Sequence, residues 1–162
     1  MAVDMFMKID GIDGESTDDQ HSKWIELLSY SHGVSQPVSG ASGTGGRTGG
    51  RADFSAFTAV KTIDNGTPDL NIKCAKGEHI PKVEVHLCEA AGDKHIFMKY
   101  TLEDVIVQSV IPSGSAGDEI KPVETVDFAY GKIKWEYISL DHKGKPGAGT
   151  DRTWDLEKNV QG

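Results

Sequence analysis

Alternating apolar and polar residues predict a β-strand at the N-terminus of the chain. The apolar positions Val3, Met5, Met7 and Ile9 lie two residues apart, so in a strand they share one face. Phe6 interrupts the otherwise polar opposite face. We interpret Phe6 as an interface residue, because a large aromatic side chain on a polar face indicates a contact.

A polar connection over residues 15–20 precedes a second predicted strand, from about 24 to 35. Its alternation assigns Trp24, Leu28 and Tyr30 to one face and Ile25, Leu27, Ser29 and Ser31 to the other. Residues 54–63, rich in aromatic and β-branched side chains, predict a third strand that ends at a turn over 64–66.

The next segment predicts a short helix over residues 68–76. Thr67 is suited to the N-cap, Pro68 to the first helical position and Gly77 to the position after the last turn. A helix this short is not stable alone, so we expect it to pack on the sheet.

Further strands are predicted over 82–89, 95–111, 123–130, 132–138 and about 152–157, with Gly131 as a turn between two of them. At 162 residues the chain fits one domain. The sequence therefore predicts a single, mainly β domain over 1–162, a barrel or sandwich of antiparallel strands with one flanking helix.

A glycine-rich arm over residues 36–53 is the most unusual segment. Its distinctive residues are Gly40, Gly43, Gly45, Gly46, Arg47, Thr48, Gly49, Gly50 and Arg51. Glycine loses the most backbone entropy on ordering, so a long glycine-dense loop is more readily ordered by a partner than within one subunit. We therefore expect the arm to dock on another molecule.

The composition narrows the classes of partner. A formal net charge of −8 disfavours non-specific binding to nucleic acid, which requires clustered Lys and Arg. The sequence contains no apolar run long enough for a membrane span and no signal peptide at its start. We expect synthesis in the cytoplasm, no membrane insertion, and export only by a route that needs no cleavable leader.

The sequence contains only incomplete versions of the known catalytic, cofactor and metal motifs. The arm lacks the Lys-Ser/Thr of a P-loop and the last glycine of a dinucleotide fingerprint, and the chain has no Gly-x-Ser-x-Gly elbow. His86 and Cys88 would share one strand face as two possible metal ligands, but no further ligands lie at zinc-site spacing. We expect no cofactor, no metal site and no enzymatic activity.

Several short motifs, in order along the whole chain, resemble the hemolysin-coregulated protein (Hcp) family of bacterial type VI secretion systems. They are the start over 1–9, Gly14-Glu15-Ser16, the segment Tyr-Ser-His-Gly-Val-Ser-Gln over 30–36, the glycine-rich arm, Thr67-Pro68-x-Leu70, Phe128-Ala129-Tyr130 and Asn159-Val160-Gln161. The resemblance implies a compact β-barrel with a flanking helix. It also implies homohexameric rings that stack into an exported tube.

The resemblance further implies partners and a lumen. The partners would be neighbouring rings, the spike protein VgrG, the contractile sheath and small effectors carried inside the ring. Ser29 and Ser31 are the candidate lumen residues, and residues 40–51 are the candidate ring-stacking loop. Family members often carry an aromatic residue where this chain has His32, so contacts there are expected to differ.

The sequence is also compatible with two other functions. One is a monomeric module that binds a peptide or glycan with the arm. The other is a small hydrolase whose Ser, His and Asp side chains meet only after folding, which requires a serine hydrogen-bonded to a histidine. The mass of the protein in solution separates the first from a ring.

Overall fold

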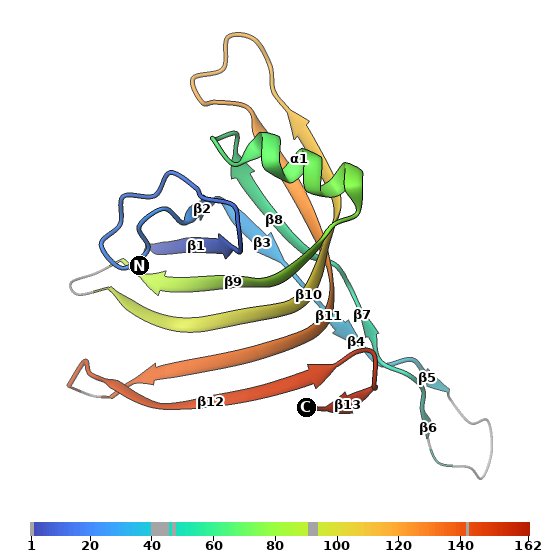
Figure 1. Ribbon diagram of the computed structural model, residues 1–162. Helices are drawn as coiled ribbons and strands as arrows, with labels where there is room; N and C mark the ends of the chain where they lie inside the picture. The colour runs from blue at the N-terminus through green and yellow to red at the C-terminus, as the bar shows by residue number, and fades with distance from the viewer. Residues whose placement is uncertain (1, 40–45, 47, 91–93, 142) are drawn as a thin grey trace.

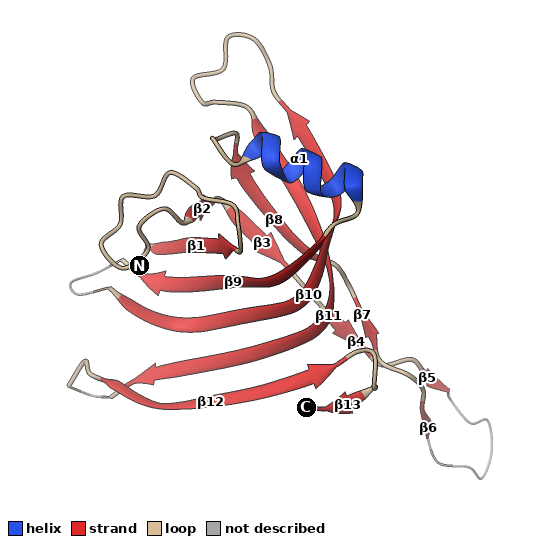
Figure 2. Ribbon diagram, in the orientation of Figure 1, coloured by secondary structure: helices blue, strands red, loops and turns tan. Residues whose placement is uncertain are grey.

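The computed structural model describes residues 2–39, 46, 48–90, 94–141 and 143–162 (Figure 1). Strands dominate it, with one helix in the described residues (Figure 2), so the predicted mainly β class is confirmed. The elements are β1 (Val3–Ile9), β2 (Ile25–Leu27), β3 (Ser29–Ser31), β4 (Val34–Ser35), β5 (Val38–Ser39), β6 (Thr48–Gly49), β7 (Asp53–Phe54), β8 (Phe57–Thr62), α1 (Thr67–Lys76), β9 (His79–Glu89), β10 (His95–Ser113), β11 (Val123–Leu140), β12 (Pro146–Asp155) and β13 (Val160–Gln161).

One nine-stranded antiparallel sheet contains most of the strands, in the order β13-β12-β11-β10-β9-β1-β2, with β8 on the far half of β11 and β3 beside β8. The two long strands β10 and β11 run through both halves of this sheet (Figure 1). At one end they pair with β9 and β12, and at the other β11 pairs with β8.

The sheet folds over on itself but does not close as a barrel. Its ladders end at β2, which pairs with β1, whereas β3 pairs with β8. Leu28 connects β2 directly to β3, and its backbone N donates to the Val60 carbonyl at 2.7 Å. The change of pairing partner at Leu28 also turns its side chain outward, so that it is 56% exposed. The prediction of one strand with a continuous face from Trp24 to Tyr30 is therefore wrong.

The hydrophobic core fills the space between the two halves of the folded sheet. Its members include Met7, Ile9, Ile25, Val83, Val85, Leu102, Phe57, Val126, Phe128 and Ile133, together with Leu70 of α1. In β8 and β11 buried and accessible residues alternate strictly from Phe57 to Thr62 and from Val123 to Phe128. One face of these strands therefore forms the core wall, and the other faces outward.

Gly131 is not a turn, because β11 continues through it as a single strand. A Cβ at this position would lie 3.1 Å from the Asp104 Oδ2 atom, and Asp104 has a φ of 52°. The glycine thus accommodates an irregular residue of the neighbouring strand β10 rather than a chain reversal.

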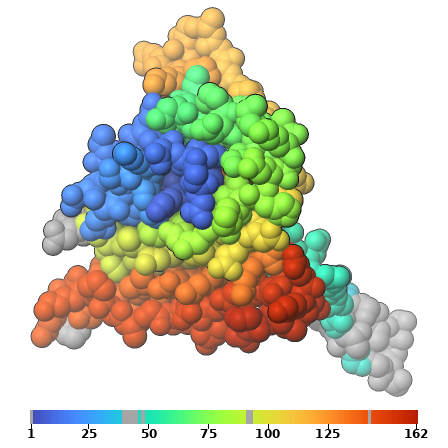
Figure 3. Space-filling model, in the orientation of Figure 1, coloured from blue at the N-terminus to red at the C-terminus, as the bar shows by residue number. Residues whose placement is uncertain are grey.

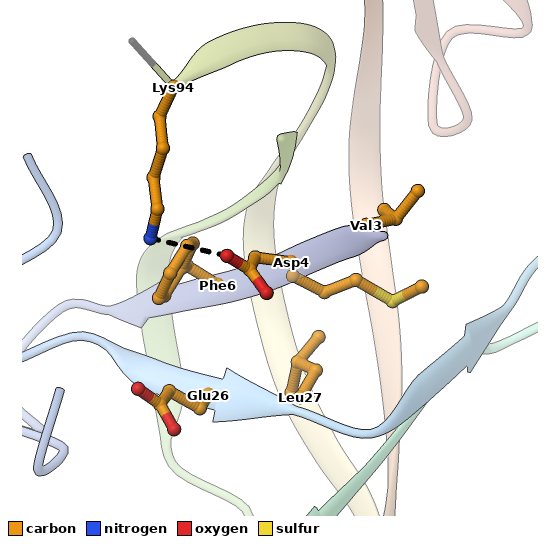
Figure 4. A pocket seen from close by; sticks show the side chains of 7 residues that line it. Val3, Asp4, Phe6, Glu26, Leu27 and Lys94 are labelled. Atoms are coloured by element: carbon orange, nitrogen blue, oxygen red, sulfur yellow. Dashed lines mark ion pairs between the residues drawn. The ribbon is translucent and has the colours of Figure 1, made fainter. Parts of the chain in front are cut away.

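Phe6 is a buried residue and not an interface residue, since only 3% of it is exposed. The ring of His21, from the loop after β1, stacks on it with a centroid distance of 4.3 Å. The Lys94 Nζ atom lies 4.8 Å from the Phe6 ring centre and pairs with Asp4 at 3.2 Å (Figure 4). Residues 15–20, predicted as an exposed connection, are mostly exposed, and His21, which follows them, covers the polar side of β1.

A hydrogen-bonded chain of Asp18, His21 and His86 fixes this covering loop. The His21 Nδ1–H donates to the Asp18 carboxylate at 2.8 Å, so His21 Nε2 accepts from His86 Nδ1–H at 3.0 Å. Burial lowers the pKa of His86 to about 4, with the neighbouring His21 and Lys99 acting in the same direction. A bond from Lys94 lowers the pKa of Asp18 to about 2.

The helix α1 begins one residue earlier than predicted, and Thr67 is not its N-cap. Gly66 occupies the N-cap position without a side-chain cap, and Gly77 follows the helix with a φ of 60°. The Thr67 hydroxyl instead donates to Glu124 Oε1 at 2.9 Å and accepts from the Asp64 backbone N at 3.0 Å. It therefore ties the start of the helix to β11.

The partner of Thr67 belongs to a buried ion pair between neighbouring strands. Lys61 of β8 and Glu124 of β11 lie directly opposite each other and pair, and neither side chain is exposed. Lys61 also contacts Asp64 at 3.1 Å. Because removing one partner of a buried pair leaves the other uncompensated, this group strongly constrains the β8, β11 and α1 junction.

No helix within the described residues is both long enough and apolar enough to cross a bilayer.

We predict that Thr67→Val lowers the free energy of unfolding by about 1–3 kcal/mol, because Glu124 loses a buried hydrogen bond while the side-chain shape is kept. Thr67→Ser retains the hydroxyl and is the matched control, expected to remain within about 0.5 kcal/mol of the parent. Chemical denaturation measures both. Equal stability of the Val and Ser variants would show that the bond to Glu124 has no net effect.

We also predict that stability falls on the acid side because of His86. Its pKa is lowered on folding, so the unfolded chain binds the proton first, and stability is lost as the pH falls from about 6.5 towards 4. Each unit of pKa difference corresponds to about 1.4 kcal/mol. Asp18 loses its own contribution only below about pH 4, because its pKa is lowered in the fold from 3.8 to about 2.

Denaturation midpoints between pH 7.5 and 4.5 measure this loss. His86→Gln keeps a donor for His21 without titrating and should make the profile shallower, while the acid loss from His32, whose pKa is also lowered, remains. His79→Gln, at an exposed histidine, should leave the slope unchanged. An unaltered slope in His86→Gln would assign the acid sensitivity to another group.

Candidate functional site

The predicted lumen residues Ser29 and Ser31 lie on the outer side of the sheet half formed by β3, β8, β11 and β10. Both are exposed, and they lie opposite Val60 and Thr58 of β8. Following the register across the sheet gives one continuous surface, which we call the hydroxyl face. It consists of Ser29, Ser31, Thr58, Val60, Thr62, Val123, Thr125, Asp127, Ser109, Ile111 and Ser113.

Small hydroxyl and β-branched side chains dominate the hydroxyl face, and Asp127 is its charged member. The Asp127 carboxylate accepts from Thr58 Oγ1 at 2.6 Å and from Ser109 Oγ at 2.8 Å. The row Ser31, Thr58, Asp127 and Ser109 thus crosses four strands in register. The result is a flat, polar and weakly charged wall.

The strands of the hydroxyl face end at two edges that have no ladder partner among the described residues. At one edge, β3 pairs only with β8. At the other, the pairing of β10 with β9 ends at Ile106 and His79, whereas its pairing with β11 continues to Ser113 and Val123. Unpaired edges of this kind are ready to pair with another chain.

The glycine-rich arm extends from this half of the molecule, and its stem is a narrow two-stranded ribbon (Figure 1). Val34 and Ser35 pair with Phe54 and Asp53, and farther out β5 pairs with β6. The arm therefore has regular structure in its stem, contrary to the prediction. The predicted arm residues Gly40, Gly43, Gly45 and Arg47 lie outside the described residues.

The remaining predicted arm residues lie in or near the stem. Thr48 and Gly49 form β6, and the Gly50 backbone N donates to the Pro37 carbonyl at 3.1 Å. Gly46 is described as irregular chain. Arg51 donates to the Leu156 carbonyl at 3.2 Å, so it contacts its own subunit.

The base of the arm is closed by paired hydrogen bonds between Gly33 and Ser55. The Ser55 backbone N donates to the Gly33 carbonyl at 3.0 Å, and the Gly33 N donates to Ser55 Oγ at 2.7 Å. Tyr130 of β11 donates to the Ser55 carbonyl at 2.8 Å. The arm is thus anchored to the body of the sheet through Tyr130.

His32 lies next to this base among aromatic side chains. The rings around it are those of Phe57, Tyr100, Tyr130 and Trp135, with centroid distances of 5.8 to 6.2 Å. Burial lowers the pKa of His32 below its ordinary value of 6.5. A half-buried histidine therefore lies within an aromatic cluster here.

The hydrolase arrangement does not form in the described part of the chain. Histidine side chains there bond to Asp18, His86, Asp104, Tyr130, Trp135 and the Ile138 carbonyl, and none bonds to a serine. Burial raises the pKa of the Cys88 thiol to about 11, which keeps it protonated near neutral pH. His86 bonds to His21, and the described residues contain no group of three metal-ligating side chains.

The sequence pointed to two residues of the hydroxyl face, Ser29 and Ser31, and not to its other members. Alternation in 54–63 and 123–130 already separates Thr58 and Asp127 from their buried neighbours. Their assembly into one surface required the strand order, because β8 pairs with β11 and not with the strand that follows it in the chain.

Comparison with known proteins places the chain in a family. The model of the family described as "Type VI secretion system effector, Hcp" matches residues 6–137. Protein hcp1 of Pseudomonas aeruginosa is 34% identical over 163 residues, covering 99% of this chain and 99% of that protein.

Solved structures agree with this assignment. A structure titled as a type six secretion system protein superposes with a TM-score of 0.95 at 38% identity, covering 99% of this chain and 100% of that chain. Hcp1 from Salmonella typhimurium superposes with a TM-score of 0.82 at 35% identity, with 99% of each chain covered. The chain therefore belongs to the Hcp family of type VI secretion proteins.

Proposed function

We propose that this protein is a non-enzymatic tube subunit of a type VI secretion system, which forms hexameric rings that stack, are exported and hold effectors in their lumen. The observation that carries the proposal is the β3-β8-β11-β10 sheet half, with the hydroxyl face on its outer side and an unpaired edge on each flank.

The two edges support ring formation. A sheet with one free edge on each side can pair β3 of one copy with the end of β10 of the next. Repetition of such a head-to-tail contact closes into a ring when a whole number of copies completes one full turn. Both edges of this sheet half are then covered, which removes the aggregation hazard of these exposed strands.

The hydroxyl face supports the lumen role. When β3 and β10 edges meet around a ring, this face continues from copy to copy as one wall. Hydroxyl groups both donate and accept hydrogen bonds, so the wall can accept varied polypeptide surfaces, while Asp127 adds one negative charge per subunit. Ser29 and Ser31 are the proposed cargo contacts near the β3 edge.

The arm supports stacking. Its stem projects away from the folded sheet (Figure 3), and the glycine-dense sequence over 40–46 makes ordering of that part within one subunit unfavourable. Contact with an adjacent ring offsets that entropy. The spike protein VgrG and the sheath are the further partners that this role implies, and neither nucleic acid nor membrane insertion is part of it.

We predict that light scattering after size-exclusion chromatography gives six times the 17.5 kDa mass of one chain. We further predict that Ser31→Cys, in a Cys74→Ser background, reacts with a small maleimide but not with one carrying a long polymer. The polymer is excluded because Ser31 faces the lumen.

The same variant dissociated in denaturant is the control and should react with both reagents. A single species at protomer mass at high concentration would reject the ring and favour the monomeric binding module. A hexamer in which both reagents react equally fast would retain the ring but remove Ser31 from its lumen.

Shortening the arm within residues 40–50 is predicted to leave single rings intact while impairing their stacking and secretion. The ring contacts involve the sheet edges, which this deletion does not touch. Negative-stain images of the rings and secretion assays measure the two effects. Loss of the hexamer in the deletion variant would instead mean that the arm joins neighbours within one ring.

A further inference from the structure

The hydrogen bonds around His32 allow only one protonation state. The Trp135 Nε1–H can only donate, and it donates to His32 Nε2 at 3.3 Å. Nε2 must therefore be the unprotonated nitrogen, so the ring proton is on Nδ1. This Nδ1 lies 3.2 Å from the Tyr130 hydroxyl oxygen and donates to it.

The chain of donors continues into the arm. Because Tyr130 accepts from His32, its own hydroxyl proton is available for the Ser55 carbonyl, to which it donates at 2.8 Å. The Ser55 backbone N donates to the Gly33 carbonyl, and the Gly33 backbone N donates to the Ser55 hydroxyl. The bond from Trp135 therefore requires a neutral His32, and the position that this bond gives the ring places Nδ1–H against Tyr130.

Protonation of His32 disrupts this arrangement. A proton on Nε2 faces the Trp135 N–H, so two donors meet and the bond between them is lost. Nδ1 keeps its proton, and the arm base is affected because the repulsion between the two donors displaces the ring from its position against Tyr130. The titratable groups packed around the ring are the phenols Tyr100 on β10 and Tyr130 on β11, with Tyr30 of β3 bonded to Tyr100 at 3.0 Å. None is a carboxylate that could accept from, or stabilise, an imidazolium.

Tyr100 and Tyr130 do not titrate with His32. Burial raises the pKa of Tyr130 to about 12 and that of Tyr100 further. His32 is therefore the group of this cluster that gains a proton in acid, at a pKa that burial lowers below 6.5.

We propose that His32 is a pH-sensitive latch: neutral, it locks the base of the glycine-rich arm to β11 through Tyr130 and Ser55, and protonated, it releases that base. The latch is a property of one subunit and is independent of ring formation. In a stacked tube, protonation of His32 would weaken the contact between the arm and the adjacent ring in acid.

The test follows amide and indole protons by NMR and hydrogen exchange between pH 7.5 and 4.5. We expect the Trp135 indole N–H signal, assigned with Trp135→Phe, to shift with a midpoint below pH 6.5. Over the same range the Gly33 and Ser55 amides should exchange about tenfold faster, after correction for intrinsic rates, as expected for the loss of about one net hydrogen bond. Amides of α1 serve as the internal reference, because β1 lies beside His86, which titrates in the same range.

Two variants separate the latch from general acid destabilisation. His32→Asn keeps an acceptor and a donor but cannot be protonated in this range, so Gly33 and Ser55 should stay protected in acid. His32→Phe lacks both groups and should expose them at every pH. Acid-induced exchange in His32→Asn equal to that in the parent, or constant protection in the parent while His32 titrates, would overturn the proposal.

Discussion

The pairing of β10 with β11 is the constraint on which the rest of this structure depends. The two strands pair from Met98 and Tyr137 to Ser113 and Val123, and every other part of the main sheet is attached to one of them directly or through a neighbour. Because strand faces alternate, this long ladder presents core residues such as Val126 and Phe128 inward while Asp127 faces outward. The core and the hydroxyl face are therefore two sides of the same ladder, and neither can shift register without disturbing the other.

The buried polar groups act at the junctions of this sheet. Lys61 and Glu124 hold β8, β11 and the start of α1 together, whereas Asp18, His21 and His86 hold the loop that covers β1. Each group is hydrogen-bonded in a definite direction, so it specifies which segments meet. Apolar burial alone would tolerate several arrangements of short strands, and directional bonds at these points select one.

The arm and the hydroxyl face are linked by the segment from Ser29 to Gly33. Ser29 and Ser31 belong to the face, His32 enters the aromatic cluster, and Gly33 begins the arm. The proposed cargo surface, the proposed stacking element and the histidine between them thus share one short stretch of chain.

The sequence alone determined the mainly β class, the positions of the principal strands, the short helix before Gly77 and the family, because alternation, turn residues and ordered motifs are local signals. It also identified Ser29 and Ser31 as candidate lumen residues. Only the tertiary structure decided that Phe6 is buried, that Thr67 bonds to Glu124, that β11 runs through Gly131, and that Thr58, Asp127 and Ser109 join Ser31 in one row. These features depend on which strands pair and what covers them, and such contacts join residues far apart in the chain, beyond the reach of local pattern.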